Sequence, residues 1–205
     1  MSAPSGLRRP KVDSLGIMLP ASWWVIDLRD DDARRRSVAR LVTQEVGPQD
    51  KLATVRAQLR SRLDAPSRDA AAAGGRLMAV SLMRAAGIPL TATVTVYRVP
   101  GAGVPGDDLE HLHAALEEAP VAGQELELAM GIEGPVLRRV YVRTAADDVD
   151  APAIPMLLVD YWLDPQDGHG LVLLSFSSPL ITAREGLLDL FDLIVASVGP
   201  DDGEP

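Results

Sequence analysis

The 205-residue chain contains no cysteine, and aromatic residues make up only 4% of it. Without cysteine the protein has no disulfide framework, no thiolate nucleophile and no zinc–thiolate site. No run of about 18 apolar residues is present, so the sequence predicts no membrane-spanning segment. Basic residues near the N-terminus are not followed by an apolar stretch, and we therefore expect no signal peptide and a cytoplasmic protein.

Positive charge is also scarce, because 20 Lys and Arg residues face 29 Asp and Glu residues and leave a net charge of -9. Such a field repels phosphate backbones and anionic lipids, so we expect neither a nucleic-acid partner nor membrane insertion. The basic residues are almost all arginine and alanine is abundant. This composition is associated with GC-rich bacterial genomes, such as those of actinobacteria.

The length and the 47% hydrophobic content fit one globular domain. Both ends of the chain are polar and rich in residues that favour loops. We therefore expect a flexible tail over residues 1–14, a single domain over 15–198, and a second flexible tail over 199–205.

Apolar spacing along the domain predicts strands and helices in a defined order. The chain is expected to begin with a strand over 16–28, either continuous or interrupted at Pro20, followed by helices over 30–46 and from 49. Strands over 76–86 and 89–99 and a helix from 107 come next. Four strands over 124–130, 135–144, 154–164 and 170–178 then precede a last helix from 182. Pro66 should break or kink the second helix, and Thr182 with Glu185 should form a capping box. Runs of strands separated by helices predict an α+β fold: a largely antiparallel sheet flanked by helices, with a helical insertion after the first strand.

Three segments carry a resemblance to a known family. They are the opening Leu19-Pro20 with the nearby tryptophans, the segment Ser175 to Pro179, and the last helix. In these segments the chain resembles the PsbP-like superfamily, whose bacterial members include LpqN-type and DcrB-type proteins and the Eag chaperones of secreted effectors. The resemblance implies an antiparallel sheet flanked by helices, and a role in binding other proteins rather than in catalysis.

Two adjacent tryptophans, Trp23 and Trp24, stand on the first predicted strand. Neighbouring side chains on a strand point to opposite faces, so one core does not easily accept both rings. Trp24 alternates with Ile26 and Leu28, and we place it in the main core. Trp23 then lies on the other face, where the helices of residues 31–73 cover it or where it marks a binding surface.

A second candidate surface lies on a later strand, where Arg139, Tyr141 and Arg143 alternate on one face and Tyr97 is expected nearby. Tyrosine and arginine are typical anchors of protein interfaces. The ladder is therefore either a partner-binding patch or an ordinary exposed strand face.

Residues that carry chemistry are few. His113 is expected to border the core, and His169 to lie in a hairpin turn. Asp160 sits among apolar strand positions, which predicts a structural pair with Arg138 more readily than a catalytic acid. The arginine run 34–36 is expected to be a solvated helix face, with an anion site as the alternative. No spacing of ligands predicts a metal site or a cofactor site.

These features favour a non-catalytic protein-binding module, such as an adaptor or chaperone in a bacterial secretion or assembly system, whose partner is another protein or a second copy of the chain. Trp23, Tyr97, Arg139, Tyr141 and Arg143 are its expected contact residues. The alternative is a small-molecule-binding protein with an apolar pocket between sheet and helices. An enzyme is a third possibility, which requires Asp160, His113 and His169 to converge.

Overall fold

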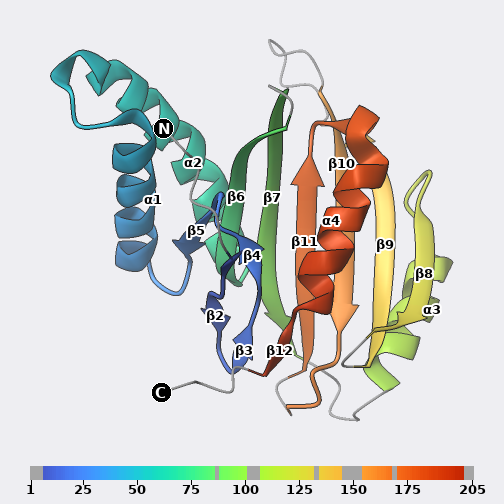
Figure 1. The fold of residues 1–205 in the computed structure, drawn as a ribbon. Coiled ribbons are helices and arrows are strands. Elements are labelled where there is room, and N and C mark those ends of the chain that lie inside the picture. Colours follow the sequence, from blue (N-terminus) through green and yellow to red (C-terminus); the bar gives the residue numbers. More distant parts are fainter. Residues whose placement is uncertain are drawn as a thin grey trace.

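The computed structural model describes residues 7–85, 88–100, 107–131, 134–144, 154–167 and 170–200. Its centre is a seven-stranded sheet in the order β5-β6-β7-β11-β10-β9-β8, in which every pair of neighbours is antiparallel (Figure 1). The strands are β5 (Trp23–Asp27), β6 (Gly75–Ala85), β7 (Ile88–Val99), β8 (Glu125–Met130), β9 (Pro135–Thr144), β10 (Pro155–Leu163) and β11 (Leu171–Ser178).

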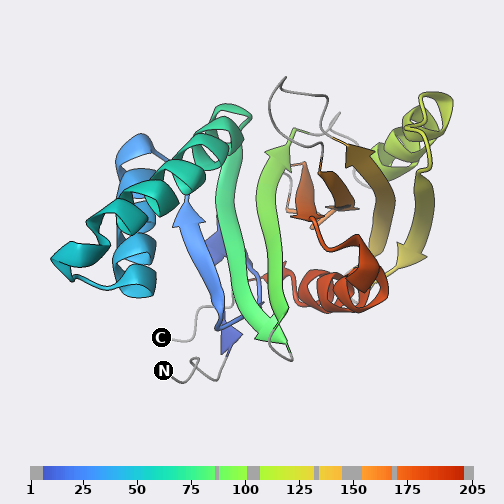
Figure 2. The ribbon, with the colours of Figure 1, turned by 90° about the horizontal axis from the view of Figure 1, so that it is seen from above.

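Helices cover both faces of this sheet (Figure 2). One face carries α1, α2 and α3, and the other carries α4. The helices are α1 (Asp31–Val46), α2 (Ala53–Ala72), α3 (Asp107–Glu118) and α4 (Arg184–Ala196). The predicted α+β class is confirmed. The expected order of elements is found, except that the predicted strand over 16–28 is divided into shorter strands, of which β5 joins the central sheet. The predicted helical insertion is also confirmed, because α1 and α2 stand between β5 and β6.

The core under α4 is built from alternate residues of the central strands. Phe176 of β11 stacks on Phe191 of α4 with ring centroids 4.2 Å apart, and Tyr161 of β10 meets Phe176 edge-on at 5.7 Å. Leu187 and Ile194 complete the buried stripe of α4. Burying each such side chain stabilises the fold by about 1.5–3 kcal/mol relative to leaving it exposed.

Two smaller clusters fill the opposite face. In the first, Val38, Leu41 and Val42 of α1 pack on the β5–β6 end of the sheet, as their helical spacing predicted. In the second, Leu109 of α3 packs against Leu137 and other apolar residues at the opposite end. The middle of this face therefore lies between two helical layers.

The ends of the chain differ from the prediction. Short strands pair around the base of α4: β1 (Leu7–Arg8) with β4 (Leu19–Pro20), and β3 (Leu15–Gly16) with both β2 (Lys11–Val12) and β12 (Gly199–Pro200). Val12 and Leu15 are buried in the α4 core, so the predicted tails are wrong for residues 7–14 and 199–200. These segments are mostly polar, so their composition did not predict that a few of their apolar residues pack into the core. Residues 1–6 and 201–205 lie outside the described part of the chain.

The helix α2 runs through Pro66, so the predicted break does not occur. Tertiary contacts hold the chain on both sides of the proline. Ser67 is fully buried, and its hydroxyl donates to the carbonyl of Asp64 and accepts a hydrogen bond from Arg34 of α1. These contacts offset the backbone hydrogen bond that proline removes.

The capping box predicted at the last helix is also absent. A short 3-10 helix, η2 (Ile181–Ala183), precedes α4, and the N-cap residue is Ala183, which has no side-chain hydrogen bond. Thr182 lies inside the 3-10 turn, where it is exposed and cannot serve as the N-cap. A similar short turn, η1 (Asp50–Leu52), leads into α2.

Candidate functional site

The two tryptophans lie on opposite faces of β5, as alternation requires, but the faces are the reverse of those predicted. Trp23 is fully buried in the α4 core. Trp24 is half-buried on the α1–α2 side, where the guanidinium carbon of Arg8 lies 5.5 Å from its ring centroid. Trp23 therefore offers no surface to a partner. The prediction failed because both faces of β5 are apolar, and Ile26 is buried under α1 rather than under α4.

The other four predicted contact residues share one face of the sheet. Strand register places them opposite α4, in the middle of the face between α2 and α3 (Figure 2). We name this surface the central strip. It consists of Thr93, Thr95, Tyr97, Arg139, Tyr141, Arg143, Leu158, Asp160, Ser175 and Ser177.

The centre of the strip is a buried ion pair. Asp160 accepts hydrogen bonds from Arg139 at 2.7 Å and from the hydroxyl of Ser175 at 2.6 Å. The Arg139 guanidinium also lies over the ring of Tyr141 at 4.8 Å and over that of Trp162 at 5.3 Å. The expectation that Asp160 pairs with an arginine is therefore right, but the partner is Arg139. Arg138 lies on the other face of β9, where it pairs with Asp192 and Glu127.

The two tyrosines of the strip keep their protons at neutral pH. Burial raises the pKa of Tyr97 and of Tyr141, and the negative charge of Asp160 raises both further. Both rings are half-buried, whereas Arg143 at the end of the ladder is exposed. The strip can therefore offer neutral phenol groups and one free guanidinium to a partner.

The residues expected of an enzyme are not brought together in the part of the chain that the structure describes. Asp160 is held by Arg139 and Ser175 on the sheet. His113 lies on α3, where its Nε2 is 3.9 Å from a carboxylate oxygen of Glu117. His169 lies outside the described residues.

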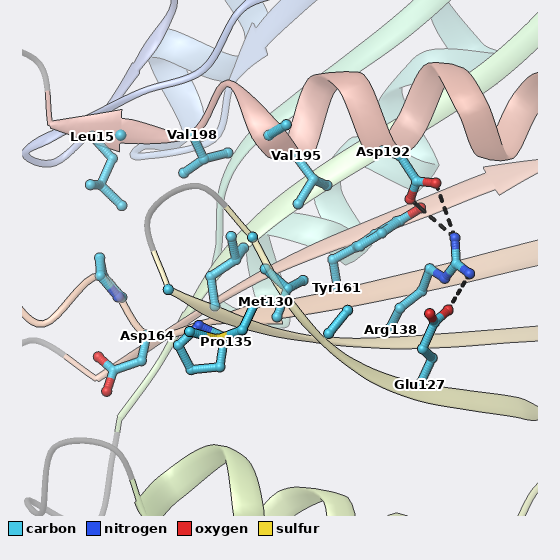
Figure 3. Close-up of a pocket in the computed structure, with 18 of the residues that line it drawn as sticks. Leu15, Glu127, Met130, Pro135, Arg138, Tyr161, Asp164, Asp192, Val195 and Val198 are labelled. Atoms are coloured by element: carbon cyan, nitrogen blue, oxygen red, sulfur yellow. Dashed lines mark hydrogen bonds and ion pairs between the residues drawn. The ribbon is translucent and has the colours of Figure 1, made fainter.

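A pocket of about 430 Å³ lies between α4 and the β8–β9–β10 end of the sheet (Figure 3). We name it the α4 pocket. Its walls are mostly apolar and come from β8, β9, β10, α4 and the short strands at the base of α4. They include Leu15, Ala129, Met130, Pro135, Val136, Leu163, Pro165, Val195, Ala196 and Val198.

One end of the α4 pocket is polar. Asp192 of α4 accepts a hydrogen bond from the hydroxyl of Tyr161 at 2.6 Å and another from Arg138 at 3.0 Å (Figure 3). Arg138 also pairs with Glu127 on β8. Burial raises the pKa of Tyr161, and the neighbouring Asp192 raises it further, so this phenol remains a donor. Two carboxylates therefore face a single guanidinium at this end.

Only weak signals in the sequence point to this polar end. Arg138 is a charge among the apolar residues Val136, Val140 and Val142 of one strand face, but the predicted partner, Asp160, is not the one it has. Asp192 occupies an ordinary polar position of an amphipathic helix. Arg138 and Asp192 meet because α4, which comes last in the sequence, packs across β9 and β10. A local sequence pattern cannot predict contacts between segments so far apart in the chain.

Neither a metal centre nor a membrane span is seen among the residues that the structure describes. No group of three or more His, Asp or Glu side chains within those residues could hold a metal ion. Within the same residues, no helix has both the length and the apolar character needed to cross a membrane.

Comparison with known proteins assigns no family. No family model matches the chain, and no curated protein is significantly similar to it.

Proposed function

We propose that the protein is a non-catalytic binding protein whose α4 pocket takes a small, mostly apolar ligand. The observation that carries this proposal is a hollow of about 430 Å³ with apolar walls and a polar cluster at one end. Ligand pockets typically measure about 300–1,000 Å³ and combine apolar walls with a few oriented polar groups. This is the alternative that the sequence offered, and the α4 pocket supports it more directly than the buried Trp23 supports a protein-binding surface.

The polar end favours a ligand with a positive or hydrogen-bond-donating head. Asp192 and Glu127 together carry one more negative charge than Arg138 balances. Both carboxylates are about half exposed, so a ligand head can approach them. The matching ligand is an amphipathic amine, with its chain along Val195 and Met130 and its head at Asp192.

The test compares decylamine, decanol and decanoate, each below the concentration at which it self-associates, by thermal shift and calorimetry. We expect the affinity order amine, alcohol, acid. A ligand at about 100 times its Kd stabilises the folded state by about 2.7 kcal/mol, which is a readily measured rise in Tm.

A matched pair of variants on α4 locates the binding. Ala196→Phe places a ring in the pocket, and we expect it to abolish the shift. Leu193→Phe adds a ring at an exposed position of the same helix and should leave binding unchanged. A wild-type protein that no compound stabilises, or an equal loss in both variants, would overturn the proposal.

The second candidate is a protein-binding function, such as that of an adaptor or chaperone in a bacterial secretion or assembly system; the PsbP-like resemblance implies protein binding. Its support is that Tyr97, Arg139, Tyr141 and Arg143 gather on the central strip, although they come from two separate strands. Because Arg139 is engaged by Asp160, the contact would rest on Tyr97, Tyr141 and Arg143.

This candidate is tested by recovery of partners from a native lysate. The double variant Tyr141→Ala/Arg143→Ala should lose a protein that the wild type retains. The control Arg60→Ala removes an exposed arginine of α2 and should retain it. If all three proteins recover the same partners, the central strip is not the partner-binding surface.

A further inference from the structure

A second hollow, of about 480 Å³, lies between the outer edge of β5 and α1. We name it the β5–α1 hollow. Three arginines line it: Arg8 from β1, and Arg36 and Arg40 from successive turns of α1. Trp24, Ser37 and Gln44 line it as well.

The three arginines of the hollow lack the ion pairs that several other arginines of the described chain form. Among the described residues, none of Arg8, Arg36 and Arg40 forms an ion pair. Elsewhere in the described chain, carboxylates pair with Arg29, Arg34, Arg35, Arg68, Arg98, Arg138, Arg139 and Arg184. Three guanidinium groups that form no ion pair with a described residue therefore gather around one hollow.

The one acidic residue of the hollow does not cancel this charge. Asp27 lines it, but Arg29 holds the Asp27 carboxylate through hydrogen bonds of 3.0 Å and 2.5 Å. These bonds lower the pKa of Asp27, and the field of Arg36 lowers it further, which indicates that Arg36 acts on this side of the hollow. The net charge of the lining is positive.

We propose that the β5–α1 hollow binds the phosphate group of a small molecule. Guanidinium groups present planar arrays of donors that match phosphate oxygens, and three of them can balance a multiply charged anion. The hydroxyl of Ser37 and the amide of Gln44 supply further donors. The half-buried ring of Trp24 also lines the hollow, and the Arg8 guanidinium lies over it at 5.5 Å, so an anion bound to Arg8 lies next to this ring.

The size of the hollow restricts the ligand to a small anion, since its volume is about 480 Å³. At physiological salt the Debye length is about 8 Å, so a compact anion bound there senses mainly the three arginines. The prediction of a solvated helix face for residues 34–36 is wrong for Arg34, which is buried. Arg34 and Arg35 pair with Asp31, and of the three arginines Arg36 alone lines the hollow.

The experiment titrates the full-length protein with pyrophosphate by calorimetry and by tryptophan fluorescence, with sodium chloride holding the ionic strength constant. Trp23 and Trp162 are buried, so an emission change on binding reports mainly on Trp24. We expect saturable binding with a Kd near or below about 1 mM. Citrate, a multiply charged carboxylate, serves as the comparison anion and should bind at least severalfold more weakly.

Two double variants with the same change of charge separate a local site from a general field. Arg36→Gln/Arg40→Gln should weaken pyrophosphate binding at least about tenfold, since it removes two charge-assisted contacts. Arg60→Gln/Arg62→Gln, on the exposed surface of α2, should leave it unchanged. Circular dichroism confirms that both variants fold. No saturable binding by the wild type, equal affinity for citrate, or equal weakening in both variants would overturn the proposal.

Discussion

At the scale of single residues, the pair of Asp160 and Arg139 links β10 to β9 inside the central strip. The Asp160 side chain is only 6% exposed, and that of Arg139 is 15% exposed. A charge this deeply buried is tolerated because its partner and further hydrogen bonds compensate for lost hydration. Asp160 is thus held between two strands, and its hydrogen bond with Ser175 extends the link to β11.

Removing either charge alone should be costly. We expect Asp160→Leu and Arg139→Leu each to lower the free energy of unfolding by about 3–5 kcal/mol, because each leaves an uncompensated buried charge. The double variant should cost less than the sum of the two, since neither charge remains. Urea denaturation of the four proteins gives the coupling energy. Strictly additive effects would show that the two side chains do not act as a pair.

The faces of the strands were predictable at this scale, but the partners across them were not. Alternation correctly separated Trp23 from Trp24 and grouped Arg139 with Tyr141 and Arg143. It could not decide which face of β5 meets α4, because both faces are apolar. It also could not choose between Arg138 and Arg139 for Asp160, since that choice depends on how β9 and β10 align.

At the scale of elements, a polar clamp joins α1 to α2. Arg34 of α1 is 2% exposed and pairs with Asp64 of α2 at 2.6 Å and with Asp31 at 2.9 Å. It also donates to the buried Ser67 hydroxyl next to Pro66. The clamp lies where the helical insertion has few apolar contacts of its own, since Ser67 is the only fully buried residue of α2.

This clamp should make stability depend on pH. The hydrogen bond from Arg34 lowers the pKa of Asp64 below its ordinary value of 3.8. A lowered folded-state pKa means that the stabilisation is complete above the unfolded-state pKa and is lost as the pH falls through the folded-state value. We expect Asp64→Asn to be less stable than the wild type at pH 7, and the difference to shrink below about pH 4.

Urea denaturation at a series of pH values measures this effect, with Asp69→Asn as the control. Asp69 is an exposed carboxylate on the same helix and forms no ion pair in the described chain. It should therefore show a small difference at every pH. A stability gap for Asp64→Asn that stays constant down to pH 2 would contradict the assigned role of the carboxylate.

The order of the elements was accessible from the sequence because it rests on long periodic patterns. The alternation of apolar residues in β7 and the apolar stripes of α1 and α4 are each long enough to predict the element from its own segment. The features that were missed depend on few residues and distant contacts. Val12 and Gly199 join the base of α4 through short strands, and Pro66 is kept within α2 by a side chain from another helix.

At the scale of the whole molecule, the two faces of the sheet are covered by helical layers that bury unequal numbers of apolar residues. The α4 side contains the largest apolar cluster, which draws on β5, β6, β7, β9, β10 and β11. The α1–α2 side has a smaller cluster that rests only on β5 and β6. Both edges of the sheet, β5 and β8, have a hydrogen-bonded neighbour on one side only.

This asymmetry predicts a gradient of local stability, which native-state hydrogen exchange measures. Amides of β7, β10 and β11 should exchange only through global unfolding, because each strand is paired on both sides and buried under α4. Amides of α2 should exchange through a local unfolding reaction of lower free energy, since few side chains of this helix are buried. Strand β8, with most of its side chains exposed, should be the least protected of the seven. Protection of α2 equal to that of β10 would show that the helical layer and the sheet unfold as one unit.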